Sequence, residues 1–171
     1  MNHHGSTVEA CVAVLTVSDS RTVEDDRSGD AIIESLADSQ HQFVTREVVR
    51  DEVDQIARAV TRWAQSQDVN TIIVSGGSGS APRDVTPEAI TPLLNARLPG
   101  FGELFRQLSY EEIGSAAMLS RADAGWIDEG SMRTAVFMLP GSPNAVQLAM
   151  RALILPQLGH LLAVCRDRNT I

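Results

Sequence analysis

Short apolar runs alternate along the chain with stretches in which apolar residues recur at helical spacing. Four runs are short and rich in β-branched residues, which predicts strands over Cys11–Val17, Phe43–Val49, Val69–Val74 and Thr134–Leu139. Helices are predicted over Ser28–Ala37, Val53–Ala64, Thr86–Leu94, Gly102–Ile113 and Pro143–Val164, the last with a break at Pro156. Strands that alternate with helices of this length indicate a parallel sheet covered on both faces, so we expect one α/β domain.

The length of 171 residues also fits a single domain. We expect it to cover residues 11–165, with residues 1–10 as a disordered N-terminus and residues 166–171 as a C-terminal tail. No charged segment followed by an apolar run opens the chain, and no apolar stretch approaches about 18 residues. A cytoplasmic protein with no membrane partner is therefore expected.

The charged residues exclude several classes of binding site and reaction. All 14 basic residues are Arg, against 22 Asp plus Glu, which gives a formal net charge of −8. Without Lys the chain forms neither a Walker-type phosphate loop nor a Schiff base. An acidic chain without a basic tract is a poor nucleic-acid binder, so we expect no nucleic-acid partner. Any anion must be held by Arg, backbone N–H groups or a metal.

Cysteine and histidine point to no redox or metal site. Cys11 and Cys165 lie far apart within apolar runs and form no C-x-x-C pair, so both are interpreted as small buried hydrophobic residues. The four histidines have no metal-ligand spacing, and His41 and His160 are interpreted as surface or core residues.

Three predicted strands run directly into polar segments. The first is followed by Ser18-Asp19-Ser20-Arg21, the third by a Gly- and Ser-rich stretch at residues 75–84, and the last by Pro140-Gly141-Ser142-Pro143. Because the carboxyl ends of parallel strands share one edge of a sheet, we expect these segments to meet. That edge is where open α/β sheets bind their ligands.

The stretch from Gly76 to Asp84 is the strongest local signal for a ligand site. Glycine tolerates positive φ and close approach, so consecutive N–H groups can converge on an anion. Thr86 as N-cap and Pro87 at the first helical position then begin a helix, whose N-terminus also favours an anion. Ser142 repeats this pattern after the last strand. The alternative is that both segments are only tight turns.

Two carboxylates border these turns. Asp84 follows the glycine stretch beside Arg83, and Asp51 stands at the exit of the second strand, just before a helix. In one interpretation Asp51 is an N-cap and Asp54 adds first-turn charge. In the other, Asp51 and Asp84 face one pocket and hold Mg²⁺ with substrate phosphates, because Mg²⁺ is bound through one or two carboxylates plus phosphate oxygens and water.

Four further polar residues have two interpretations each. Ser18 and Asp19 are either a polar turn after the first strand or ligand contacts. Ser120 and Arg121 are polar within an apolar neighbourhood, so they form either a capped turn or ligand contacts.

These segments resemble the molybdenum-cofactor biosynthesis family of MogA- and MoaB-like proteins, to which the G domains of gephyrin and of a plant protein are related. The matching segments are, in chain order, Thr16–Asp19, Asp26–Gly29, Gly76–Gly79, Arg83–Ala89, Ser120–Ala122 and Leu139–Pro143. They span nearly the whole chain. The segments Gly100–Arg106 and Ser109–Gly114 look most like the MoaB branch.

The resemblance implies a three-layer α/β/α domain with a mostly parallel sheet, of the molybdopterin-binding type, assembled as a homotrimer or homohexamer. Active members adenylylate molybdopterin with ATP and release pyrophosphate, which implies molybdopterin as substrate, ATP as co-substrate and Mg²⁺ as cofactor. Asp84 and Asp51 match the family's catalytic, metal-holding aspartates. The implied substrate-binding residues are Thr16, Ser18, Asp19, Asp26, Ser28, Gly76, Gly77, Ser78, Gly79, Arg83, Ser120, Arg121, Pro140, Gly141 and Ser142.

Two positions depart from the family pattern. Ser78 stands where Thr is usual, which keeps the hydroxyl and removes a methyl. The stretch Ile127–Arg133 is more acidic and longer than usual, and we expect a loop that would disfavour a phosphate if it overhung the pocket. A non-catalytic molybdopterin-binding or scaffolding protein is the alternative function. Retention of Asp51, Arg83 and Asp84 favours the enzyme, because a carrier has no need of metal-holding carboxylates.

Overall fold

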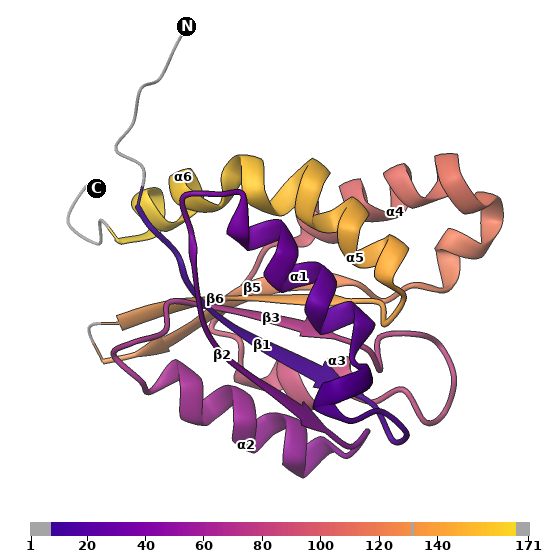
Figure 1. The fold of residues 1–171 in the computed structure, drawn as a ribbon, viewed down its shortest axis with the longest axis horizontal. Coiled ribbons are helices and arrows are strands. Elements are labelled where there is room, and N and C mark those ends of the chain that lie inside the picture. The colour runs from indigo at the N-terminus through magenta and orange to yellow at the C-terminus, as the bar shows by residue number, and fades with distance from the viewer. Residues whose placement is uncertain (1–7, 131, 167–171) are drawn as a thin grey trace, which may run out of the picture.

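A six-stranded sheet forms the centre of the structure, a computed structural model that describes residues 8–130 and 132–166 (Figure 1). Its strands are β1 (Cys11–Val17), β2 (Gln42–Val49), β3 (Thr71–Ser75), β4 (Ala96–Arg97), β5 (Asp123–Glu129) and β6 (Met132–Leu139). Their order across the sheet is β2-β1-β3-β6-β5-β4. The first four of these run parallel, whereas β5 pairs antiparallel with β6 and β4 antiparallel with β5.

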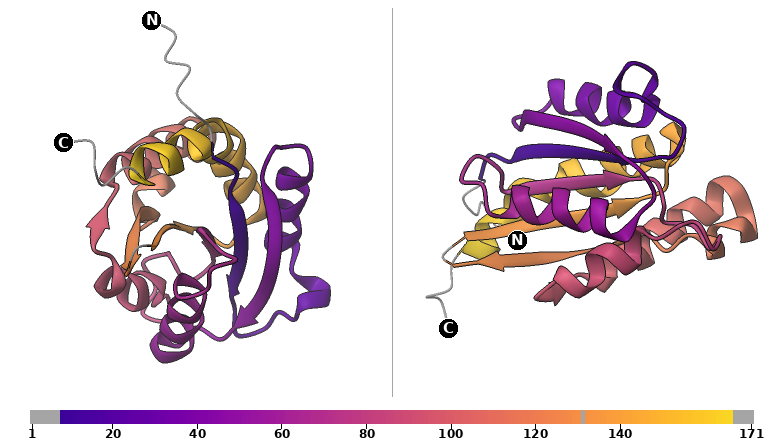
Figure 2. Two further views of the ribbon diagram at one scale, coloured as in Figure 1. Left: turned by 90° about the vertical axis from the view of Figure 1, so that its left-hand side faces the viewer. Right: turned by 90° about the horizontal axis from the view of Figure 1, so that it is seen from below.

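Helices cover both faces of the sheet, as the end-on view makes plain (Figure 2). They are α1 (Arg27–Ala37), α2 (Val53–Ala64), α3 (Thr86–Ile90), α4 (Pro99–Ile113), α5 (Pro143–Ala149) and α6 (Leu155–Arg166). Short 3-10 segments are η1 (Val23–Asp25), η2 (Thr91–Leu93) and η3 (Gly114–Leu119), and η4 (Met150–Ile154) is π-helical. One layer contains α1, α4, α5 and α6, and the other contains α2 and α3 (Figure 1). The expected three-layer α/β/α domain is therefore confirmed.

The central strands divide the core into two apolar layers. In β1, Val12 and Val14 pack with the α1, α4, α5 and α6 layer, whereas Ala13 and Leu15 pack with α2 and α3. All five residues of β3 are buried. Continuous apolar runs are what parallel strands need when helices cover both faces.

The C-terminal helix is interrupted by the π-helical η4, just before Pro156. Proline has no N–H to donate to the carbonyl four residues earlier, and a widened turn accommodates that loss. From Pro143 to Cys165 the helix is also long and apolar enough to cross a membrane, with a mean hydropathy of 1.6 in its most apolar window. The expectation that no stretch approaches this length is thus wrong. Met150, Ile154 and Leu158 of this helix are buried in the core, and 39% of the apolar window is buried inside the structure.

The predicted parallel strands and helices are observed with small shifts of their ends, but two strands were not predicted. β4 and β5 extend the sheet beyond β6. Ile127–Arg133 is consequently not a loop over the pocket. Asp128 pairs with Arg133 in the register of the β5–β6 hairpin, whose turn at Gly130 lies where β6 begins, opposite the carboxyl ends of the parallel strands.

The described fold begins earlier than expected at the N-terminus. The Val8 N–H donates to the carbonyl oxygen of Gly159 at 3.1 Å, and Ala10 is completely buried. Residues 8–10 therefore belong to the folded domain rather than to a disordered segment, while residues 1–7 lie outside the described residues. At the other end, α6 includes Arg166, and residues 167–171 of the expected tail lie outside the described part.

The strand order reverses at β1, because β2 lies on one side of it and β3 on the other. Such a reversal opens a crevice at the carboxyl ends of the two strands that diverge. We call the side of the sheet where β1, β2, β3 and β6 end the carboxyl edge. The polar segments that follow β1, β3 and β6 all begin there.

Candidate functional site

Residues 76–84, here called the glycine loop, pack tightly against the ends of β1 and β6. Gly76 and Gly77 have φ values of 97° and 60°, a conformation that favours glycine. A Cβ at Gly76 would lie 2.2 Å from the carbonyl oxygen of Val17, and one at Gly141 would lie 3.2 Å from the Gly76 Cα. The Gly76 N–H donates to the carbonyl oxygen of Leu139 at 3.0 Å. The predicted meeting of the three segments is confirmed.

Thr86 closes the glycine loop instead of capping α3. Val85 occupies the N-cap position without a side-chain capping bond. The buried Thr86 hydroxyl donates to the carbonyl oxygen of Gly76 at 2.8 Å, and its N–H donates to that of Gly77 at 2.9 Å. The predicted N-cap is thus wrong, because the hydroxyl satisfies a loop carbonyl.

Asp84 is half-buried and turned back onto the loop that carries it. Its Oδ2 accepts the Ala81 N–H at 3.0 Å, while the Asp84 N–H donates to the Ala81 carbonyl at 2.9 Å. A Cβ at Gly79 would lie 2.6 Å from the same Oδ2. Glycine at this position therefore lets the carboxylate lie directly against the backbone.

Asp51 reaches the other side of the glycine loop. The N-cap of α2 is Glu52, so the N-cap interpretation of Asp51 is wrong. Its Oδ1 accepts the Val85 N–H at 3.4 Å and lies 2.4 Å from where a Cβ on Gly77 would stand. Burial raises the pKa of the Asp51 carboxyl above its ordinary value, and the carboxylates of Asp84 and Asp19 raise it further, against the bond from Val85.

Asp19 and Arg83 form an ion pair beside Asp51. Arg83 Nε and Nη2 donate to the two Asp19 oxygens at 2.7 and 2.9 Å, and the hydrogen bond from Arg83 holds the pKa of Asp19 below its ordinary value. The Asp51 N–H also donates to Asp19, at 3.3 Å. Next to this pair the Ser18 hydroxyl accepts the Arg21 N–H at 3.2 Å, which is the polar-turn arrangement.

Thr16, Asp26 and Ser28 form a buried network behind the site. Asp26 caps α1 by accepting the Gly29 N–H at 2.9 Å. It also accepts the hydroxyls of Thr16 at 2.7 Å and Ser28 at 3.0 Å. All three predicted binding residues are buried, and these hydrogen bonds link the end of β1 to the start of α1.

Arg121 holds the glycine loop through its carbonyl oxygens. Its Nε donates to the Gly79 oxygen and its Nη2 to the Asp84 oxygen, both at 2.7 Å, and Nη1 pairs with Glu88. Its backbone N–H donates to the Ser78 oxygen at 2.8 Å. These donors are used within the protein, which favours a structural role over direct ligand contact.

The neighbours of Arg121 differ in how their hydroxyls are used. The Ser120 hydroxyl accepts the Ala122 N–H at 3.3 Å, as in a capped turn. The Ser78 hydroxyl is buried and makes no hydrogen bond with the described residues. A buried polar atom at the base of the loop is therefore left without a partner among the described residues.

The Pro140-Gly141-Ser142 segment is joined to the β1 loop by a residue that was not predicted. Ser142 caps α5 as expected, accepting the Ala145 N–H at 3.3 Å. Arg21 donates from Nη1 to the Gly141 carbonyl at 3.4 Å and to the Ser28 hydroxyl at 3.0 Å. The absence of Lys, which forces anion binding onto Arg, is the sequence signal that pointed to such a residue.

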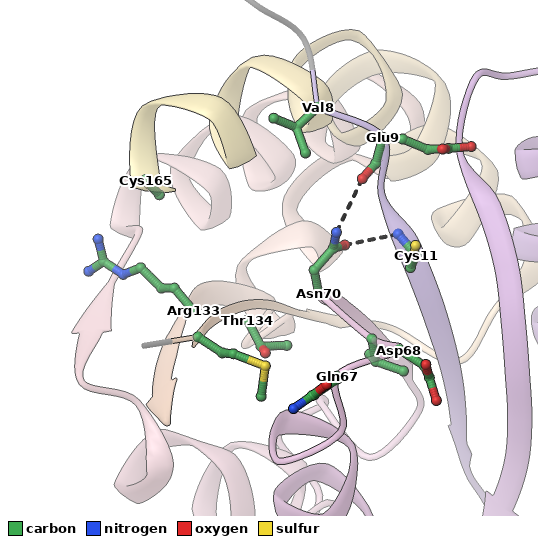
Figure 3. Close-up of a pocket in the computed structure, with 11 residues that line it drawn as sticks. Val8, Glu9, Cys11, Gln67, Asp68, Asn70, Arg133, Thr134 and Cys165 are labelled. Carbon is green, nitrogen blue, oxygen red and sulfur yellow. Dashed lines mark hydrogen bonds between the residues drawn. The ribbon is translucent and has the colours of Figure 1, made fainter. Parts of the chain in front are cut away.

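A cavity of about 620 Å³ lies at the opposite edge, where β1, β3 and β6 begin (Figure 3). Cys11 and Cys165 both line it and are half-buried rather than fully buried as expected. The Asn70 side chain accepts the Cys11 N–H and donates to the Glu9 carbonyl (Figure 3), and it also accepts the Thr71 hydroxyl. None of the predicted site residues lines this cavity. Smaller hollows, of about 400, 490 and 390 Å³, adjoin the predicted residues at the carboxyl edge.

Comparison with known proteins agrees with the geometry. A family described as "Probable molybdopterin binding domain" matches residues 13–160. Molybdenum cofactor biosynthesis protein B of Bacillus subtilis (strain 168) is 49% identical over 154 residues, covering 90% of this chain and 88% of that protein.

Solved structures give the same result. The crystal structure of a molybdenum cofactor biosynthesis protein B matches with a TM-score of 0.87 and 43% identity, over 95% of this chain and 99% of that one. The tungsten cofactor synthesizing protein MoaB from Pyrococcus furiosus matches with a TM-score of 0.84 and 36% identity, over 93% and 98%. The chain therefore belongs to the molybdopterin-binding-domain family, among the molybdenum cofactor biosynthesis proteins.

Proposed function

We propose that this protein adenylylates molybdopterin with Mg-ATP, giving adenylyl-molybdopterin and pyrophosphate. The observation that carries the proposal is the approach of two carboxylates to one glycine loop. Asp51 and Asp84 come from different elements, yet each touches the space above a loop glycine, Gly77 and Gly79 respectively. A protein that only carried the pterin would gain nothing from burying one carboxylate and raising its pKa beside a second.

Asp51 and Asp84 fit a magnesium ion. One oxygen of each carboxylate accepts a backbone N–H, and the other accepts no hydrogen bond from the described residues. Among those residues no three His, Cys, Asp or Glu side chains converge as metal ligands. Mg²⁺ is commonly bound by one or two carboxylates together with substrate phosphates, so two suffice. When bound there, the ion would neutralise charge on the phosphates.

In nucleotidyl transfer the protein itself positions the two anionic substrates so that the attacking oxygen is aligned with the phosphorus atom. An oxygen of the molybdopterin phosphate attacks the α-phosphorus of ATP, and the bond to pyrophosphate breaks as the new P–O bond forms. The glycine loop and the Pro140-Gly141-Ser142 segment supply backbone N–H groups for the nucleotide. Ser18 and Asp19, on the neighbouring loop, face the pterin side. No Lys is needed for these roles.

The second candidate is a non-catalytic molybdopterin-binding or scaffolding protein. The observation that favours it is the Asp19–Arg83 pair, because a cation already neutralised by a carboxylate is less available to a triphosphate. A cytoplasmic location and the absence of nucleic-acid and membrane partners remain predictions.

Turnover of the purified chain with molybdopterin, ATP and Mg²⁺ tests the proposal, with adenylyl-molybdopterin and pyrophosphate as readouts. Asp84→Asn keeps an oxygen that can accept the Ala81 N–H but removes the charge. Asp54→Asn, in the first turn of α2, is the matched control. We expect turnover in the wild type and control, and almost none in Asp84→Asn. A wild-type protein that binds molybdopterin without forming product would favour the carrier instead.

A further inference from the structure

The arginines at the carboxyl edge differ in how their charge is used. Arg83 is paired with Asp19, and Arg121 is paired with Glu88. Arg21 forms no ion pair with any residue in 8–130 or 132–166. Its charge is therefore not neutralised by a partner, in a protein whose net charge is −8.

Arg21 is nevertheless held in place. Its Nη1 donates to the Ser28 hydroxyl at 3.0 Å and to the Gly141 carbonyl at 3.4 Å, both neutral acceptors. Its backbone N–H donates to the Ser18 hydroxyl at 3.2 Å. The remaining guanidinium donors, on Nε and Nη2, have no acceptor among the described residues. A half-buried cation fixed from one side with open donors on the other is preorganised for an anion.

The surroundings of Arg21 suit a ligand that bridges the site. Arg21 lines a hollow of about 490 Å³ at the ends of β1 and β2, together with Asp19, Glu24 and Arg50. Asp19 is already paired with Arg83. The bond from Arg21 to Gly141 reaches the proposed nucleotide segment. Arg21 thus stands between the loops assigned to the two substrates.

We propose that Arg21 binds a phosphate group of the substrate through Nε and Nη2. The planar guanidinium presents paired donors that match two phosphate oxygens, which an ammonium group does not. This inference rests on the proposed function for its choice of ligand, a phosphate ester. Either ATP or molybdopterin supplies that group, so the test measures each separately.

Binding is measured by calorimetry on the full chain, with ATP, pyrophosphate and molybdopterin as separate probes. Arg21→Met removes the charge and the donors, and Arg50→Met removes the same charge from the same hollow. We expect Arg21→Met to weaken binding of at least one probe about 10-fold to 100-fold, as for loss of hydrogen bonds to a charged group. Arg50→Met is expected to change affinity by less than about threefold, because the exposed Arg50 side chain makes no hydrogen bond with the described residues that would hold it in place, whereas Arg21 is held by Ser28 and Gly141.

Two further measurements separate binding from loop support. Arg21→Lys keeps the charge and is expected to recover part of the affinity but not the paired geometry. Raising the salt concentration is expected to weaken the wild type more than Arg21→Met, since only the wild type has the charge to screen. A purely structural Arg21 would leave the salt dependence unchanged, which would overturn the inference.

The outcomes also assign the phosphate. Weaker binding of ATP and pyrophosphate alone places the nucleotide on Arg21, and weaker binding of molybdopterin alone places the pterin phosphate there. Equal effects of Arg21→Met and Arg50→Met, or none from Arg21→Met, would overturn the inference. A wild type that binds these probes through Arg21 but forms no adenylyl product would refute the proposed function and leave this inference standing.

Discussion

Replacing Arg121 by Met is expected to disorder the glycine loop while leaving the domain folded. The side chain supplies the donors to the Gly79 and Asp84 carbonyls and the ion pair with Glu88. Met fills a similar length of space without donors. The backbone bond from residue 121 to Ser78 is retained, so only the side-chain contribution is removed.

The magnitude follows from those contacts. A hydrogen bond to a charged group contributes about 1.5–3 kcal/mol, and the exposed pair with Glu88 contributes about 0–1 kcal/mol. The Arg121 side chain is 35% exposed, so water replaces part of what is lost. Because two such bonds are lost, we expect the free energy of unfolding to fall by about 2–4 kcal/mol. Turnover should fall about 100-fold, because misplacing Asp84 by about 1 Å is enough for that.

Urea unfolding, turnover and hydrogen exchange of the loop amides together test this reasoning. Arg62→Met is the control, since Arg62 is an exposed arginine that pairs with Glu47 and lies over the Trp63 ring at 5.6 Å. Its effect on unfolding is expected to stay within about 1 kcal/mol. If Arg121→Met lost turnover with unchanged loop exchange, Arg121 would be a direct ligand contact. Unchanged turnover and stability would refute the structural role altogether.

Three further predictions follow from single contacts. Gly77→Ala should lower the melting temperature and turnover, because at a φ of 60° its Cβ would lie 2.4 Å from Asp51 Oδ1 and 2.4 Å from Thr86 Oγ1. Gly100→Ala is the control and should change neither quantity, because its Cβ would meet nothing within 4 Å. Burial lowers the pKa of His41, so the unfolded chain binds a proton at this residue before the folded chain does as the pH falls. The free energy of unfolding, measured by urea titration, should therefore decrease below about pH 6.5, and His41→Gln should remove that decrease. Light scattering should give a mass of three or six chains, and Leu104→Glu should lower it, because Leu104 is half-exposed beside an apolar hollow between α4 and α6.

The sequence predicted the parallel part of the fold and missed its antiparallel extension. β1 and β3 are central strands buried on both faces, so their residues form the continuous apolar runs that identify strands. β5 reads Asp-Ala-Gly-Trp-Ile-Asp-Glu, with acidic ends and a glycine, and β4 has two residues. Neither strand shows the alternation of apolar and polar residues that identifies a strand in a sequence. Their pairing with β6 and with each other depends on tertiary contacts instead.

Position along the chain located the site, but side-chain partners did not follow from it. Because β1, β3 and β6 are parallel, Ser18, Gly76 and Gly141 lie at one edge of the sheet, whichever residues their side chains contact. That Asp51 bonds to Val85 instead of capping α2, and that Thr86 closes a loop, depend on distances between segments remote in sequence. Arg121 is the clearest case, because its contacts with Gly79 and Asp84 favour one of two interpretations that composition left equal.

The balance of charge at the site predicts how ATP binding depends on Mg²⁺. Asp51 and Asp84 lie near each other, and Asp84 helps to raise the pKa of Asp51, so negative charge is already disfavoured there. A triphosphate should be repelled until a divalent cation reverses the local charge, and calorimetry in EDTA should therefore show ATP affinity at least about 10-fold weaker than in Mg²⁺. In Mg²⁺, Asp84→Asn should bind ATP more weakly than the wild type, because the variant lacks a metal ligand. In EDTA, the variant should bind ATP at least as tightly as the wild type, because it lacks a repulsive charge. The same order of affinities in both buffers would mean that Asp84 holds neither the metal nor a charge near the phosphates.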